Sequence, residues 1–429
     1  MNIRVVERLK KSPLARDSFW ALFGNAAGKG LALIAGIAIA RFLGSDEYGE
    51  YGLIKGTLLS IAIFSSFGLG YTATKYIAEC RQTNIQKARE IHRINFIITL
   101  CSSALIAILV SLFAQPIAIW LKDDSLAEIL RWASIAVIFN AIITTQNGEL
   151  SGFRAYKTVA RNNIISGFLT FFFVAPAAYF GGLRWAIIAL VITLFCNCLI
   201  NAYSLRILLN TSNKNKPLVI SSKFVKEILS FSFPIALQES LYSIASWLGM
   251  AIIIRLADYS ELGVYSAANQ WMAVMLFIPG ALRNVALSHL AENSNNSETS
   301  KRIGNQLLLV NFVSTCIPFI IIAIFSKLIA SAYGPSFVKL PLVLNVCIFT
   351  AVISSMTNVL TQDLIAHNQN WYLFWTRLIR DSFTLVIAYL AIRYVHYQAS
   401  AIYATAVLSM QTFYLINLMI KRKQLYKKK

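Results

Sequence analysis

The sequence predicts an all-α polytopic membrane protein of about twelve transmembrane helices, arranged as two parallel, pseudo-symmetric six-helix bundles around a central cavity. Three observations predict this fold class. Of the 429 residues, 57% are hydrophobic and only 14% are charged, whereas a soluble domain has roughly 45–50% apolar and about 25% charged residues. Apolar stretches of membrane-spanning length recur along the chain, and one motif returns half a chain length later. A chain this apolar needs lipid around it, which excludes a soluble enzyme and a disordered tail.

The length of the apolar stretches predicts where the helices lie. A transmembrane helix needs about 20 predominantly apolar residues, and several of the candidate spans are longer, which indicates tilt or helix extending beyond the lipid. A count of ten or eleven also fits, since the fifth and sixth spans can be read as one segment broken around Gly181 and Gly182. The twelve candidates are 17–43, 48–78, 93–121, 126–152, 162–181, 184–206, 227–255, 262–290, 304–332, 338–365, 371–394 and 398–420.

Basic residues lie in alternate loops and predict the orientation. The 39 Lys and Arg residues outnumber the 19 Asp and Glu residues, which gives a formal net charge of +20. In a soluble protein this excess of positive charge would suit a nucleic acid as partner. Here the basic residues lie in one set of alternate loops, at 81–93, 154–161, 214–226, 301–302 and both termini. The opposite loops are short and nearly neutral or acidic. The positive-inside rule therefore places both termini in the cytoplasm, requires an even number of spans and removes the need for a nucleic-acid partner.

The chain repeats itself after 214 residues. The segment 41–51, RFLGSDEYGEY, aligns without a gap with 255–265, RLADYSELGVY. Each half then holds six helices, and because six is even, both halves enter the membrane from the same side. We predict an N-terminal bundle at 1–212, a C-terminal bundle at 213–429, and a binding site between two parallel repeats, as in alternating-access transporters.

Three short motifs carry a resemblance to a known family. They are ARFLGSDEYGEY at 40–51, FGLGYTATKYIAE at 67–79 and GFRAY at 152–156. The chain resembles the Wzx-type polysaccharide repeat-unit (O-antigen) flippases of the multidrug/oligosaccharidyl-lipid/polysaccharide exporter superfamily, in these motifs and in its length, helix count and repeat. The resemblance implies translocation of undecaprenyl-pyrophosphate-linked oligosaccharides across the bacterial inner membrane, in lipopolysaccharide biosynthesis. It also implies a polysaccharide polymerase and chain-length proteins as partners.

Basic residues inside the predicted spans are the candidates for binding a diphosphate, because an anion within the membrane needs cationic partners. We expect Lys29, Lys55 and Arg283 to line a cationic cavity. Lys29 lies near the middle of the first span, where exposure to lipid would cost roughly 2.5–3.5 kcal/mol. Lys55 can instead extend to the interface, and Arg283 can stabilise a kink after Pro279 and Gly280 by pairing with a neighbouring helix.

Two further charged residues complete the predicted site. Glu239 lies within the seventh span, where its carboxyl group can be protonated, paired with a cation or used as a Na⁺ or H⁺ relay. Arg380, near Arg377, can contact substrate, reach the headgroups or pair with Asp381 or Asp363. Polar residues in the spans can meet sugar hydroxyls or, more commonly, bridge helices; they are Asn25, Asn140, Gln146 and Asn147. We expect Glu149 to pair with Arg154 or Lys157.

Other functions are less consistent with the sequence. A membrane glycosyltransferase or polymerase would need a larger extracytoplasmic loop, and the four histidines have no ligand spacing. We therefore expect no catalytic residue, metal or cofactor. A cation-coupled drug exporter of the same superfamily would favour acidic residues deep in the N-terminal half, where none is present. Flippases of the peptidoglycan precursor, by resemblance, tend to be longer by two helices, so twelve predicted helices fit the repeat-unit exporters better.

Overall fold

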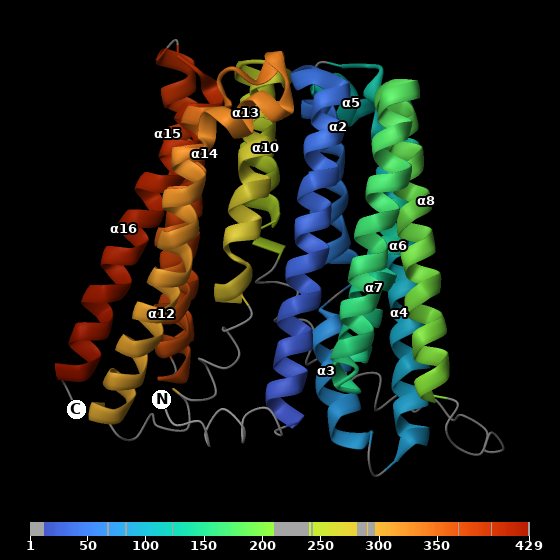
Figure 1. Cartoon of the computed structure of the whole chain (residues 1–429), viewed down its shortest axis with the longest axis vertical. Coiled ribbons are helices and arrows are strands. Elements are labelled where there is room, and N and C mark those ends of the chain that lie inside the picture. Colours follow the sequence, from blue (N-terminus) through green and yellow to red (C-terminus); the bar gives the residue numbers. More distant parts are fainter. Residues whose placement is uncertain are drawn as a thin grey trace. The chain divides into compact units, whose positions relative to one another are not determined.

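The computed structural model is built from helices (Figure 1), and the part of the chain that it describes contains no strand. Seven helices in this part are long and apolar enough to cross a membrane. Many of their large apolar side chains are exposed, which is the surface that lipid requires. The predicted all-α membrane fold is thus confirmed. The described residues are 13–66, 68–81, 84–121, 123–209, 240–241, 243–280, 290, 297–367, 369–395 and 397–427.

The chain forms two compact units. Unit 1 comprises Met1–Ala35 and Leu53–Trp247, and unit 2 comprises Gly36–Gly52 and Leu248–Lys429. The stretch Gly36–Gly52 therefore belongs by its packing to the unit that contains the C-terminal half of the sequence. The predicted boundary at residues 212 and 213 lies outside the described residues.

Glycines in the left-handed region divide consecutive helices in the first half of the chain. Gly44 (φ 75°) bends α2 between the first two predicted spans, and Gly182 (φ 62°) bends α8 between the fifth and sixth. Gly68 (φ 66°) ends the second predicted span early and begins a separate helix, a break that hydropathy alone did not predict. The elements of this part of the chain are α2 (Pro13–Ser66), α3 (Leu69–Cys80), α4 (Ile85–Leu112), α5 (Ala114–Trp120), α6 (Leu126–Gly152), α7 (Tyr156–Leu169), the π-helix η1 (Thr170–Val174) and α8 (Ala175–Leu209).

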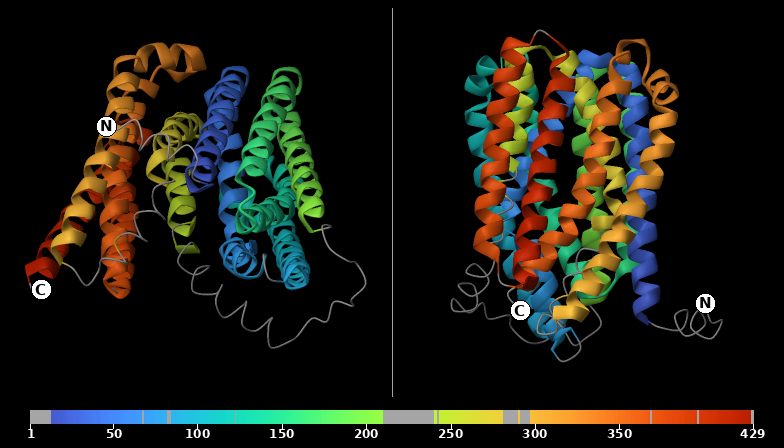
Figure 2. Two further views of the ribbon diagram at one scale, coloured as in Figure 1. Left: turned by 60° about the horizontal axis from the view of Figure 1, so that its bottom comes forward. Right: turned by 90° about the vertical axis from the view of Figure 1, so that its left-hand side faces the viewer.

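Helix α6 is the central helix of unit 1 and packs against α3, α4 and α8 (Figure 2). Its bounds match the predicted span 126–152. The third predicted span, 93–121, is instead divided at Phe113 into α4 and the short α5. Asn84 begins α4, since its side chain accepts a hydrogen bond from the Lys87 backbone N–H at 3.0 Å.

Unit 2 repeats the order of helices found in unit 1. The α12–α13–α14 succession matches α4–α5–α6, and α14 (Leu340–Ala366) lies 214 residues after α6 at both of its ends. This spacing equals the offset of the sequence repeat. The remaining elements are a helix at Ser243–Leu256, α10 (Tyr259–Met275), α12 (Ser297–Ile324), α13 (Ser326–Tyr333), the 3₁₀ turn η2 (Pro335–Phe337), α15 (Asn370–Tyr394) and α16 (Ala399–Lys427).

Candidate functional site

One face of α6 is polar although the helix is membrane-spanning. Asn140, Thr144 and Asn147 recur at helical spacing; Thr144 is exposed, and the other two are half-buried. The Thr144 hydroxyl donates to the Asn140 backbone carbonyl at 2.9 Å. Polar residues exposed within the length of a spanning helix are costly in hydrocarbon. This face is therefore suited to water or a polar ligand.

A polar seam joins this face to α7 and α8. Asn201 donates to the Asn147 side-chain carbonyl at 3.3 Å and accepts from Asn162 at 2.8 Å. Asn162 also donates to Ser204 at 3.2 Å, and Asn197 donates to Ser166 at 3.1 Å. We define the polar seam as Asn147 of α6, Asn162 and Ser166 of α7, and Asn197, Asn201 and Ser204 of α8.

The seam and the neighbouring Gln146 contain more hydrogen-bonding capacity than they use. The side-chain oxygens of Asn162 and Gln146 are buried and accept no hydrogen bond from a described residue. The Gln146 amide donates to the Cys198 backbone carbonyl at 3.2 Å. Gln146 therefore bridges α6 and α8, and bridging of helices was one of the two roles predicted for it. Buried acceptors of this kind generally bind water, so each of these two oxygens can accept a hydrogen bond from a water molecule.

Close packing places Lys29 beside the seam. A Cβ atom on Gly24 would lie 2.1 Å from that of Ala160, and one on Gly28 would lie 3.1 Å from that of Asn163. Glycine at these positions lets α2 approach α7 closely. The Lys29 side chain, one residue beyond this contact, is exposed, and a Cβ on Gly30 would meet nothing within 4 Å. Lys29 therefore lies between Gly28, where α2 packs closely against α7, and Gly30, where the space beside α2 is open.

Lys55 belongs to the same unit and is half-buried. Two residues further on, the Thr57 hydroxyl accepts a hydrogen bond from the indole of Trp247 at 2.9 Å. Trp247 also stacks on Trp120, with ring centroids 5.8 Å apart and an interplanar angle of 15°. Two stacked indole rings therefore lie beside the segment that carries Lys55.

Arg380 has partners within unit 2. Its guanidinium group lies 2.6 Å from Asp381 and donates to the Gln411 side chain at 3.1 Å; it also covers the Tyr414 ring. Gln411 in turn donates to Thr357 at 2.8 Å. The pairing with Asp381 matches one predicted alternative, while a contact from Arg380 to substrate stays a prediction. Arg283 and Glu239 lie outside the described residues, so their roles stay predictions as well.

Glu149 pairs with a residue that the sequence did not indicate. Its carboxylate lies 2.7 Å from His92 of α4, not against Arg154 or Lys157. The expected partners were neighbours in sequence, whereas α4 reaches Glu149 only through helix packing. Asp363, 214 residues later, likewise pairs with Arg422 at 2.6 Å and His367 at 3.3 Å. Each unit thus has a buried carboxylate at the equivalent end of its central helix.

A third buried carboxylate lies at the opposite end of unit 2. Glu261 accepts hydrogen bonds from Lys339 at 2.6 Å and from the Ser400 backbone N–H at 2.9 Å. Burial raises the pKa of Glu261, but the hydrogen bonds from Lys339 and Ser400 outweigh it and hold the pKa below its ordinary value. The same contact raises the pKa of Lys339. This cluster fastens α10 to the starts of α14 and α16.

Most residues of the seam were not predicted from the sequence. Asn197, Asn201 and Ser204 recur every three or four residues along an otherwise apolar stretch, which is a helical polar stripe. This pattern was the available signal. Among the residues that the structure describes, no group of His, Cys, Asp and Glu side chains could hold a metal ion.

Two comparisons of sequence connect the chain to known proteins. The model of a family described as "Polysaccharide biosynthesis protein" matches residues 38–309. The EPS I polysaccharide export inner membrane protein EpsE of Ralstonia nicotianae is 24% identical over 396 residues, 89% of each chain. An uncharacterized membrane protein of Methanocaldococcus jannaschii is 24% identical over 272 residues, which cover 60% of this chain and 62% of the relative.

Solved structures with the same fold are transporters of the MOP superfamily. The inward-facing conformation of a multidrug resistance MATE family transporter superposes with a TM-score of 0.76 at 15% identity, covering 94% of this chain and 95% of the other. A MOP superfamily transporter from Pyrococcus furiosus, described as having a binding pocket of reverse polarity, superposes with a TM-score of 0.62 at 15% identity, covering 96% of this chain and 95% of the other. These likenesses show that the chain shares the fold of these transporters.

Proposed function

The chain belongs to the polysaccharide biosynthesis protein family, and from this premise we propose that it translocates undecaprenyl-pyrophosphate-linked oligosaccharide repeat units across the bacterial inner membrane. Membership in this family and the MOP fold support a membrane transporter in polysaccharide biosynthesis. The export role in the name of EpsE supports the direction of transport. The proposed mechanism is alternating access, with both termini in the cytoplasm.

The observation that carries the proposal is the hydrophilic surface of unit 1. A lipid-linked oligosaccharide presents a diphosphate and sugar hydroxyls to the protein and leaves its prenyl chain in lipid. Lys29 and Lys55 supply ammonium groups for the diphosphate, since a cation is the partner that an anion within a membrane requires. The exposed polar face of α6 supplies amide and hydroxyl groups for sugars.

Different residues have different proposed roles. Lys29 and Lys55 bind the diphosphate, whereas Asn140, Thr144 and Asn147 contact sugars. The polar seam holds Asn147 in place through Asn201. Arg283 and Glu239 are proposed as a third cation and an ion-coupling group on their sequence positions alone. Since the donors of Arg380 are engaged by Asp381 and Gln411, we propose that it acts on substrate only after this network rearranges.

Complementation tests the proposal. The full chain is expressed in a bacterium that lacks its own repeat-unit flippase, and surface polysaccharide is scored for wild type, Lys29→Ala and Lys29→Arg. We expect wild type to restore polysaccharide, Lys29→Ala to abolish it and Lys29→Arg to restore part of it, because arginine keeps the charge with a different geometry. Lys427→Ala, which removes an exposed lysine from the end of α16, is the matched control and should behave as wild type.

Membrane expression of each variant separates a transport defect from a folding defect. If wild type and Lys29→Ala both complement, Lys29 does not bind the substrate and the proposed site is wrong. If wild type does not complement in hosts with several repeat-unit structures and confers drug resistance instead, the protein is a drug exporter.

A further inference from the structure

A groove between α4 and α6 opens on the side of unit 1 away from the polar face of α6. Its cavity volume is about 750 Å³, within the 300–1,000 Å³ typical of small-molecule sites. Arg131, which lines it, is nine residues from Asn140, or about two and a half helical turns. The groove and the polar face therefore lie on opposite sides of α6, and the proposed oligosaccharide site does not include the groove.

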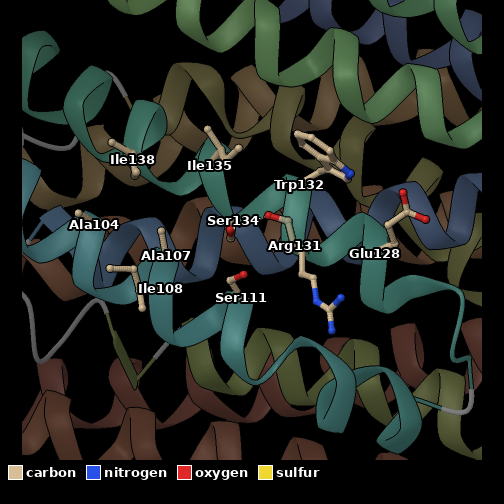
Figure 3. Close-up of a pocket in the computed structure, with 10 residues that line it drawn as sticks. All are labelled: Ala104, Ala107, Ile108, Ser111, Glu128, Arg131, Trp132, Ser134, Ile135 and Ile138. Carbon is tan, nitrogen blue, oxygen red and sulfur yellow. Dashed lines mark hydrogen bonds between the residues drawn. The ribbon is translucent and has the colours of Figure 1, made fainter.

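The lining of the groove changes from apolar to charged along its length. Figure 3 shows Ala104 and Ile138 at one end, Arg131 and Glu128 at the other, and Ser111 and Ser134 between them. The charged end lies near the start of α6, where α4 also ends. From Ile138 to Glu128 the groove follows α6 for about 15 Å, given a rise of 1.5 Å per residue. That length is about half of the 30 Å hydrocarbon core, or one leaflet.

The apolar part of the groove is open to its surroundings. Ile108 is 58% exposed, Trp132 is 53% exposed and Ile135 is 38% exposed. Side chains of this kind at membrane depth contact hydrocarbon, and a concave surface among them accepts a chain. The α4–α6 contact continues towards the other end of both helices through the hydrogen bond between Thr99 and Thr145 at 3.0 Å.

The charged end of the groove carries one cation, Arg131, beside a carboxylate that is paired with an arginine outside the groove. Glu128 pairs with Arg184 at 2.8 Å, whereas Arg131 is exposed and makes no ion pair with a described residue. The Ser134 hydroxyl donates a hydrogen bond to the Arg131 backbone carbonyl at 2.7 Å. The Ser111 hydroxyl makes no hydrogen bond to the part of the chain that the structure describes, so it and the Arg131 guanidinium are available to a bound anion.

We propose that this groove binds an anionic phospholipid, with the phosphodiester headgroup at Arg131 and Ser111 and one acyl chain along Ile108, Ile135 and Ile138. A cation at the interface end of an apolar, leaflet-long groove matches the charge and the polarity gradient of such a lipid. Basic pockets between transmembrane helices bind anionic headgroups for the same reason. A soluble metabolite would gain nothing from the apolar end. Phosphatidylcholine has the same phosphodiester, but Arg131 would repel its choline cation, so a lipid with a net negative charge should bind better.

Lipid retention tests this site. The full chain, purified in detergent, is mixed with palmitoyl-oleoyl phosphatidylglycerol or with phosphatidylcholine of the same chains, and the retained lipid is counted by native mass spectrometry. We expect wild type to prefer phosphatidylglycerol, and Arg131→Gln to lower its retention about tenfold, the effect of losing one charge-assisted hydrogen bond. Arg393→Gln removes an exposed arginine at the end of α15 and should retain the lipid as wild type does.

A second variant tests the chain-binding end. Ala104→Phe fills the apolar end and should lower retention of both lipids, while thermal unfolding shows that each variant is folded. Equal retention of the two lipids by wild type, or unchanged retention by folded Arg131→Gln, would overturn the proposal. Displacement of phosphatidylglycerol by an equimolar amount of undecaprenyl phosphate would also overturn it, because the occupant would then be the prenyl carrier.

Discussion

At the residue scale, buried carboxylates lie near helix ends in both units of this protein. Glu149, Asp363 and Glu261 are each almost completely buried, and each is paired with a cation or a histidine. Burial of a carboxylate is unfavourable unless hydrogen bonds replace its hydration. These pairs therefore fix how the helices meet rather than bind a ligand.

Protonation of Glu261 should loosen unit 2 at acidic pH. Because its folded pKa lies below the ordinary value of about 4.3, its contribution is present above that value and lost as the pH falls through the folded pKa. The pKa of Lys339 is raised, so its contribution is complete below about 10.4 and lost only as the pH rises further. The pair thus stabilises the protein fully between about pH 5 and 10.

Substitution of Glu261 checks this assignment. We expect Glu261→Gln to lower the free energy of unfolding at pH 7 by about 1–3 kcal/mol, less than for a fully buried pair because Lys339 is half exposed. When the pH is lowered below 5, the melting temperature of the variant should also fall less than that of wild type. Equal melting temperatures for the two proteins at pH 7 would contradict the role given to Glu261.

At the element scale, glycines set the distances between helices. A Cβ on Gly148 would lie 2.0 Å from the Gly70 carbonyl oxygen, and the Thr74 hydroxyl donates to the Gly148 carbonyl at 2.9 Å. The backbones of α3 and α6 thus touch directly. This contact explains the glycines of the FGLG segment: Gly68 begins α3 in a left-handed conformation, and Gly70 permits the approach to α6.

Gly148→Ala should therefore separate α3 from α6. We expect a loss of about 1–3 kcal/mol of stability, the usual cost of overpacking, measured by thermal unfolding of the purified protein. Gly30→Ala is the matched control, since its new methyl group would meet nothing within 4 Å and alanine favours a helix. Equal destabilisation by both substitutions would refute the close contact as the cause.

Hydropathy predicted the helices well where a span is bounded by polar turns, as for α6 and α14, and less well where backbone geometry ends a helix within an apolar run. Gly68 and Phe113 are such breaks: the residues on both sides are apolar, so a window of hydropathy continues across them. The predicted cations Lys29 and Lys55 share one unit, but the partners of Glu149 and Arg380 depended on which helices pack together. Sequence spacing along a single helix could not supply that information.

At the scale of the whole molecule, the repeat and the distribution of basic loops describe one topology. The helix bounds of α6 and α14 coincide at the 214-residue spacing found in the sequence. Six helices in each half would bring residues 214 apart to the same side of the membrane. Both termini should therefore share one compartment with the basic loops.

Alkaline phosphatase fusions measure this topology, because the enzyme requires disulfides and is active only in an oxidising compartment. We expect activity for a fusion after Asp124, and no activity for fusions after Arg154 or after Lys427. The opposite pattern would invert the orientation, and activity at the C-terminal fusion together with the Asp124 fusion would contradict the even number of spans.

The stretch Gly36–Gly52 has a consequence for protein engineering. It lies early in the chain but packs in unit 2, where Gly49 approaches the Tyr259 carbonyl and Ser260 donates to Ser45 at 2.7 Å. A chimaera that joins the first half of this chain to the second half of a relative would separate these partners at its sequence junction. A chimaera made to alter cargo selectivity should therefore take residues 36–52 and the second half of the chain from the same parent protein.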